Sequence, residues 1–222
     1  MQIQAGTLIQ TRAILFDMDG TLVDSTASVE RIWTHWGNGH GLSFADFAHR
    51  MHGRRAVDIM QALAPEGIDL EREVAQLDED ELNDTDGIIP IPGAAELIAS
   101  LPKGSWALVT SARPPLARAR MAAAGLPLPD LIVTSSDVAL GKPHPECYLT
   151  ALDRLGVAAG DAVVFEDAHA GLASGKAAGC RTIALATTTP NHELDHEDWL
   201  HDLSHVTLEN VLSDGTLQLH IR

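Results

Sequence analysis

Five short apolar runs recur along the chain, and polar or turn-forming residues follow them. The runs lie at Ala13–Phe16, Trp106–Val109, Leu131–Val133, Ala162–Phe165 and Thr182–Leu185. Uninterrupted apolar runs of this length are typical of parallel strands that are buried on both faces. Stretches with helical features lie between them, at Gly93–Leu101, Pro114–Ala124, Pro145–Leu155 and Ala168–Ala178. Strands that alternate with single helices predict an α/β fold with a parallel sheet and right-handed crossovers.

Residues 26–88 break this alternation. They contain no convincing strand but four amphipathic stretches, at Val29–Trp36, Phe44–Met51, Ala56–Leu63 and Leu70–Leu82. We expect a helical cap domain, residues 25–88, inserted into a core that consists of residues 1–24 and 89–222. The proline-rich segment 88–93 is the expected return hinge. Such an insert would cover the carboxyl end of the first strand, where open α/β sheets bind ligands.

The composition narrows the class of protein. Hydrophobic residues make up 45% of the 222 residues, as in a folded soluble chain. The net charge of −16 argues against nucleic acid or an anionic membrane as a partner, because phosphate groups attract clustered Lys and Arg. We find no apolar stretch approaching ~18 residues and no secretory leader. Two cysteines, Cys147 and Cys180, fit a reducing compartment, so we expect a cytoplasmic enzyme.

Two acidic runs carry much of the negative charge. Residues 66–86 hold ten acids against Arg72 alone, and residues 191–202 hold five acids and no Lys or Arg. Dense acids of one sign are usually solvated. We therefore interpret both runs as faces that keep the protein in solution.

The segment Asp17-Met-Asp-Gly-Thr21 follows the first apolar run directly. An aspartate at the end of such a strand can attack phosphorus and become an aspartyl-phosphate, so Asp17 is a candidate nucleophile. Asp19 can protonate the leaving alkoxide and later deprotonate a water. Gly20 allows a tight turn that directs backbone N–H groups at an anion. Taken alone, the segment is equally compatible with a turn that merely ends a strand.

Polar residues at three later strand ends favour a catalytic role for this segment over a simple turn. Thr110–Ser111 suits the oxygens of a phosphate, although a helix cap is the commoner role of such residues. Lys142 offers an ammonium, although a single lysine usually faces solvent. Glu166 and Asp167 end the fourth run, where burial penalises two acids unless a cation is present. Oxygen ligands from Asp17 and Asp167 suit Mg²⁺.

In these four places the chain resembles the haloacid dehalogenase superfamily of phosphotransferases, whose motifs match DMDGT, TS, GKP and ED. The resemblance implies a Rossmann-like, doubly wound core with an inserted helical cap. It implies that Asp17 is the nucleophile and Asp19 the general acid and base. The phosphate-binding residues would be Gly20, Thr21, Thr110, Ser111 and Lys142. The Mg²⁺ ligands would be the Asp17 carboxylate, the Asp19 backbone carbonyl and Asp167, with Glu166 as a further or water-mediated ligand.

Longer stretches are similar to the branch that acts on sugar and polyol phosphates. They are the cap segment His52–Arg55 and residues 141–149 and 164–180. The resemblance implies a small phosphorylated sugar or polyol as substrate and a monomer or weak homodimer as the enzyme. The cap also carries Arg50, Arg54 and Arg55, of which we expect Arg55 to close over the phosphate or the sugar hydroxyls. The alternatives are a surface cluster that balances the acids of the cap and, for His52, a structural role at a helix end.

Several other functions remain as alternatives. A sugar phosphomutase similar to β-phosphoglucomutase would share Asp17, Asp19 and the cap, and Thr21 favours hydrolysis over this reaction. The segment His192–His196 spells HExxH, the pattern of zinc proteases, but lies in an acid-rich tract. A non-catalytic binding module is disfavoured because every expected catalytic group is present. Haloacid dehalogenation is disfavoured because that branch lacks the second aspartate of the first motif.

Overall fold

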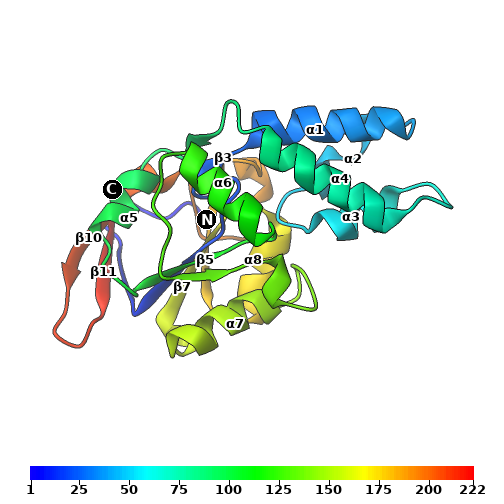
Figure 1. Ribbon diagram of the computed structural model, residues 1–222. Coiled ribbons are helices and arrows are strands. Elements are labelled where there is room, and N and C mark those ends of the chain that lie inside the picture. The colour runs from blue at the N-terminus through cyan, green and yellow to red at the C-terminus, as the bar shows by residue number, and fades with distance from the viewer.

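A six-stranded parallel sheet forms the centre of the molecule, in the order β6-β5-β2-β7-β8-β9 (Figure 1). The computed structural model describes residues 1–222, the side chain of Arg50 excepted. The strands are β2 (Ala13–Phe16), β5 (Trp106–Val109), β6 (Leu131–Val133), β7 (Ala162–Glu166), β8 (Arg181–Leu185) and β9 (Trp199–Leu200). All five neighbouring pairs are parallel, which confirms the predicted α/β fold class.

Helices cover both faces of this sheet, because β2 and β5 are apolar at every position and β7 is apolar at every position but its last, Glu166. Ile14 and Phe16 of β2 pack into one core with helices α5 (Ala94–Ser100) and α6 (Pro114–Ala123). Leu15 packs into the other core, with helix α7 (Glu146–Leu155). Helix α8 (His169–Ala177) contacts β7 and β8. Residues 13–16 are therefore almost completely buried, as expected of a central parallel strand.

The five apolar runs are all strands, and β7 and β8 are each one residue longer than the sequence predicts. The sequence analysis missed the two-residue strand β9 and a separate antiparallel sheet of β1 (Leu8–Thr11), β11 (Leu217–Ile221) and β10 (Val206–Val211). Burial alternates along β1 and β11, so these strands are buried on one face only. Such alternation in four or five residues is a weak signal.

Residues between β3 (Val23–Asp24) and β4 (Ile89–Pro90) form the helical insert. Its helices are α1 (Thr26–Gly39), α2 (Phe44–Phe47), a 3₁₀ turn (Ala48–Arg50), α3 (Ala56–Leu63) and α4 (Leu70–Asn83). They share a core of their own around Trp33, Trp36 and Phe47, and Figure 1 shows them gathered at one end of the molecule. The predicted helix at 44–51 is shorter because it changes to a 3₁₀ turn at Ala48.

A small antiparallel pair joins the insert to the sheet. Strand β3 (Val23–Asp24) pairs with β4 (Ile89–Pro90), which lies in the predicted return hinge. The exact limits of a separate domain, residues 25–88, stay a prediction. None of the helices in the part of the chain that the structure describes is both long and apolar enough to cross a bilayer.

Candidate active site

The candidate site lies at the carboxyl ends of three adjacent strands. Asp17 follows β2, Thr110 follows β5, and Glu166 ends β7. Strand β2 lies between β5 and β7 in the sheet. Since all three strands run in the same direction, their polar ends meet at one edge, as the sequence predicts.

Lys142 is the centre of this cluster. It is buried, and its Nζ donates to Asp17 Oδ1 at 2.5 Å, to Glu166 Oε1 at 2.6 Å and to the carbonyl oxygen of Val109 at 3.2 Å. Burial acts to lower the pKa of the ammonium, but attraction by Asp17 and Glu166 outweighs it and raises the pKa. Burial also raises the pKa of Asp17 well above its usual range, although Lys142 opposes this shift. The solvent-facing alternative for Lys142 is therefore wrong.

The acids of this cluster fit a hard divalent cation. Asp17, Glu166 and Asp167 each offer a carboxylate oxygen, and these oxygens lie within 4.8 Å of one another. All three side chains are buried, and burial raises the pKa of Asp167 to about 7. Three buried carboxylates against one ammonium leave an excess of negative charge, and oxygen ligands of this kind are what Mg²⁺ prefers. The donor set therefore fits the expected metal.

Glu166 and Asp167 differ in how far the protein already satisfies them. Glu166 accepts hydrogen bonds from Lys142, from the hydroxyl of Tyr148 at 2.9 Å, and from the backbone N–H groups of Asp167 and Ala168. Among the described residues, Asp167 accepts only from two hydroxyl groups, those of Thr21 at 3.2 Å and Thr188. Glu166 is thus held chiefly as the partner of Lys142. Direct ligation of a metal by Glu166 stays a prediction.

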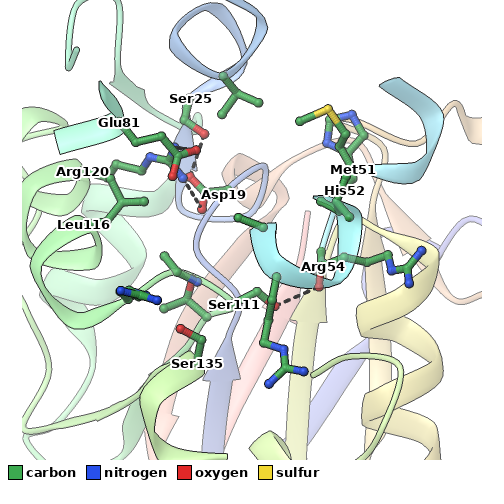
Figure 2. Close-up of a pocket in the computed structure, with 18 of the residues that line it drawn as sticks. Asp19, Ser25, Met51, His52, Arg54, Glu81, Ser111, Leu116, Arg120 and Ser135 are labelled. Atoms are coloured by element: carbon green, nitrogen blue, oxygen red, sulfur yellow. Dashed lines mark hydrogen bonds and ion pairs between the residues drawn. The ribbon is translucent and has the colours of Figure 1, made fainter. Parts of the chain in front are cut away.

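Asp19 stands apart from the buried triad and faces a cavity of about 310 Å³ between the sheet and the insert. Its Oδ1 accepts from the Ser25 hydroxyl at 2.6 Å, and its Oδ2 lies 3.0 Å from Nη1 of Arg120. Arg120 also pairs with Glu81 of helix α4, at 3.1 Å. Figure 2 shows these four side chains together on one wall of the cavity. A carboxylate at this place can exchange a proton with a molecule in the cavity.

Residues 51–54 of the insert form the opposite wall, where Figure 2 shows Met51 and His52. Burial lowers the pKa of His52, although the charge of Asp19 opposes this shift. Arg54 also lines the cavity, and its Nε is buried with no partner among the described residues. Arg55 lies at the cavity as well, but its guanidinium is paired with Asp58 at 2.8 Å. The geometry thus leaves Arg54 freer than Arg55 to meet a ligand.

The other residues predicted to bind phosphate also lie at the site, and each makes hydrogen bonds within the protein. The Ser111 hydroxyl donates to the carbonyl oxygen of Gly53 at 2.9 Å and so connects the sheet to the insert. The Thr110 hydroxyl accepts from the N–H of Ala112 at 3.0 Å. Gly20 has φ of 84°, and a Cβ there would lie 2.2 Å from Asp167, so only glycine fits. Its own N–H donates to Val23 and is not directed at the cavity. The side chain of Arg50 lies outside the described residues.

Sequence reasoning missed several residues of the site: Ser25, Glu81, Arg120, Tyr148 and Thr188. Tyr148 carried a signal, because it is the single tyrosine of the chain and lies in the stretch 141–149. Glu81 was interpreted as part of a solvated face, and this is wrong, since its side chain is 8% exposed. Only tertiary structure shows that α4 lies against α6.

The HExxH segment does not form an α-helix. Asn191–Glu193 is a 3₁₀ turn, and residues 195 and 196 lie in a hydrogen-bonded turn. The side chain of His192 is 76% exposed. Zinc proteases of this type need both histidines on one face of a helix, so the segment lacks the required geometry.

Comparisons with known proteins agree with this site. The model of the haloacid dehalogenase-like hydrolase family matches residues 11–179. Hexitol phosphatase A of Escherichia coli is 40% identical over 205 residues, which cover 90% of this chain and 95% of that protein. Glycerol-1-phosphate phosphohydrolase 1 of Saccharomyces cerevisiae is 36% identical, over 81% of this chain and 76% of that protein.

A solved structure shares the fold. The crystal structure of β-phosphoglucomutase from Clostridium difficile has a TM-score of 0.75, and the match covers 87% of this chain and 92% of that one. At 18% identity this likeness concerns the fold alone. The family match spans most of the chain and all four motifs. The predicted family and enzyme class are thereby confirmed, and the chain belongs to the haloacid dehalogenase-like hydrolases.

Proposed function

We propose that this protein is a Mg²⁺-dependent phosphatase that hydrolyses phosphomonoesters of small sugars or polyols through an aspartyl-phosphate. The observation that carries the proposal is the placement of Asp17 at the base of the cavity, fixed by Lys142 and beside two further acids. Both curated relatives described above are named as phosphatases of polyol phosphates. The cavity, about 310 Å³, has room for a small phosphorylated molecule.

The proposed reaction has two steps. In the first, a carboxylate oxygen of Asp17 attacks phosphorus, the bond from phosphorus to the substrate oxygen breaks, and Asp19 gives its proton to that oxygen. In the second, Asp19 takes a proton from a water whose oxygen attacks phosphorus, and the bond to Asp17 breaks to release phosphate.

The buried charges support this chemistry. Lys142 holds Asp17 in place and adds positive charge beside the phosphoryl oxygens. A Mg²⁺ ion held by Asp17, Asp167 and the backbone carbonyl of Asp19 would offset the excess negative charge of the acids and bind a phosphate oxygen. The insert covers the cavity and limits the access of bulk water.

The test is a measurement of phosphate release with Mg²⁺ across glycerol phosphates, hexitol and hexose 6-phosphates, 2-deoxy sugar phosphates and hexose 1-phosphates. Isomerisation of each sugar phosphate is followed in parallel. We expect phosphate release, its loss in EDTA, its return with Mg²⁺, and no turnover in a folded Asp17→Asn variant. Isomerisation without net release of phosphate would identify a mutase and overturn the proposal. Full activity of Asp17→Asn would refute the assignment of Asp17 as the nucleophile.

A further inference from the structure

Arg120 is a buried cation that the proposed reaction does not use. It lies on α6 of the core, and its side chain is 4% exposed. Its two terminal nitrogens contact different carboxylates: Nη1 lies 3.0 Å from Asp19 Oδ2, and Nη2 lies 3.1 Å from Glu81 Oε1. Asp19 belongs to the loop after β2, whereas Glu81 belongs to α4 of the insert. One guanidinium therefore connects the catalytic loop to the insert (Figure 2).

The arrangement fixes the carboxylate of Asp19 from two sides. Arg120 holds Oδ2 through a planar, rigid fork, and the Ser25 hydroxyl holds Oδ1 at 2.6 Å. Rotation of the carboxylate would break both contacts. It would also leave the buried guanidinium with one partner fewer, which is costly because a buried charge needs compensation.

We propose that Arg120 is a positioning residue: it orients Asp19 for proton transfer, and through Glu81 it makes that orientation depend on the placement of the insert. This inference rests on the proposed function, because it takes Asp19 as the general acid and base. If the insert moves away from the core, Glu81 leaves with α4, and Arg120 loses the contact that fixes its second nitrogen. Asp19 is then held correctly only while the insert covers the substrate.

If Arg120 has this role, the effect of its loss on the rate of the first step should depend on the leaving group. An alkoxide needs a proton from Asp19 to leave, whereas 4-nitrophenolate leaves without one. Misplacing Asp19 therefore slows attack on glycerol phosphate but spares the first step with 4-nitrophenyl phosphate. General acid catalysis contributes about 10²–10⁴-fold, so we expect Arg120→Met to lower the first-step rate with the alkyl substrate by roughly 10- to 100-fold. The first step with the aryl substrate should change by less than about threefold, because it needs no acid.

The experiment measures single-turnover formation of the phosphoenzyme with glycerol 1-phosphate and with 4-nitrophenyl phosphate, in the presence of Mg²⁺. Arg118→Met is the matched control, since Arg118 lies on the same helix and is exposed. Arg120→Lys keeps the charge but loses the planar guanidinium, so it serves as the test variant if Arg120→Met does not fold. Glu81→Gln tests the connection to the insert. We expect each of these two variants to lose rate selectively with the alkyl substrate.

Three outcomes decide the inference. Equal losses on both substrates would show that Arg120 has only a structural role and would overturn it. Unchanged rates in Arg120→Lys and Glu81→Gln would overturn it as well, as would a selective loss in Arg118→Met. Failure of the proposed function looks different, because the wild-type protein itself would then form no phosphoenzyme.

Discussion

Replacing Lys142 by Met removes the one cation that forms ion pairs with Asp17 and Glu166 in the part of the site that the structure describes. Methionine keeps most of the volume and the unbranched shape of the side chain, so packing changes little. Asp17 and Glu166 would lose donors at 2.5 and 2.6 Å and would be left buried without the opposite charge. We therefore expect the metal-free variant to be folded but less stable than the wild-type protein.

The size of the loss follows from these two contacts. At an effective dielectric constant of 20, charges separated by 2.5 and 2.6 Å attract each other by about 6 kcal/mol per pair. Part of this attraction only offsets the cost of burying the ions, so removing one partner of a buried pair costs about 3–5 kcal/mol. For a chain of this size, 1 kcal/mol corresponds to roughly 2–4 °C in melting temperature. We expect Lys142→Met to melt about 6–20 °C lower.

The assay is thermal unfolding followed by circular dichroism in EDTA, so that no divalent cation replaces the lost charge. Lys103→Met is the matched control, because the side chain of Lys103 is 86% exposed and its ion pair with Asp130 is 3.5 Å long. An exposed pair contributes about 0–1 kcal/mol, so the control should melt within a few degrees of the wild-type protein. Adding Mg²⁺ should restore part of the loss in Lys142→Met. If both lysine variants melt at the same temperature, the buried pairs contribute no stability and the reasoning fails.

Two further predictions concern stability. Burial lowers the pKa of His52, so below about pH 6.5 this histidine binds more protons in the unfolded chain than in the folded one, and its contribution to stability should fall as the pH drops from 7.5 to 5.5. The raised pKa of Asp167 acts in the opposite direction over this range, so the test is the difference between two proteins. Urea unfolding at several pH values should show that the wild-type protein loses stability relative to His52→Gln as the pH drops, and identical slopes would contradict the assignment. A Cβ on Gly171 would lie 1.6 Å from Glu166 Oε1, so Gly171→Ala should lower the free energy of unfolding by about 1–3 kcal/mol. Gly160→Ala is its control, because a Cβ there meets open space; equal stability of the two variants would refute the clash.

The parallel sheet could be predicted because burial on both faces leaves a simple pattern. Residues 13–16 are apolar at every position, and so are the other central strands except for Glu166 at the end of β7, which makes each run visible without any knowledge of its neighbours. The antiparallel sheet could not be predicted in the same way. Strand β1 is only four residues long, and its exposed face carries Leu8 and Gln10 between buried residues. Its pairing with β11, about 200 positions later, is a purely tertiary feature.

The residues of the candidate site also differ in whether the sequence could predict them. Residues that follow an apolar run directly, such as Asp17 and Glu166, could be predicted because the strand fixes where they lie. Residues on helices could not. The sequence places Arg120 among several arginines and Glu81 among many acids, and neither has a local signature. Their importance arises from the packing of α4 against α6, which local periodicity does not report.

The acidic run of the insert therefore has two parts with different physical roles. Two ion pairs connect α4 to α6 or to the residue just before it: Asp78 with Arg113, at 2.8 Å, and Glu81 with Arg120 of α6, at 3.1 Å. Arg113 is largely exposed, so salt and water weaken its pair, whereas the other pair is buried and little screened. The buried pair can form only when the insert lies over the sheet, because Glu81 belongs to the insert and Arg120 to the core. We expect the net charge of the chain to keep the protein in solution, while this single glutamate helps to fix where the insert rests.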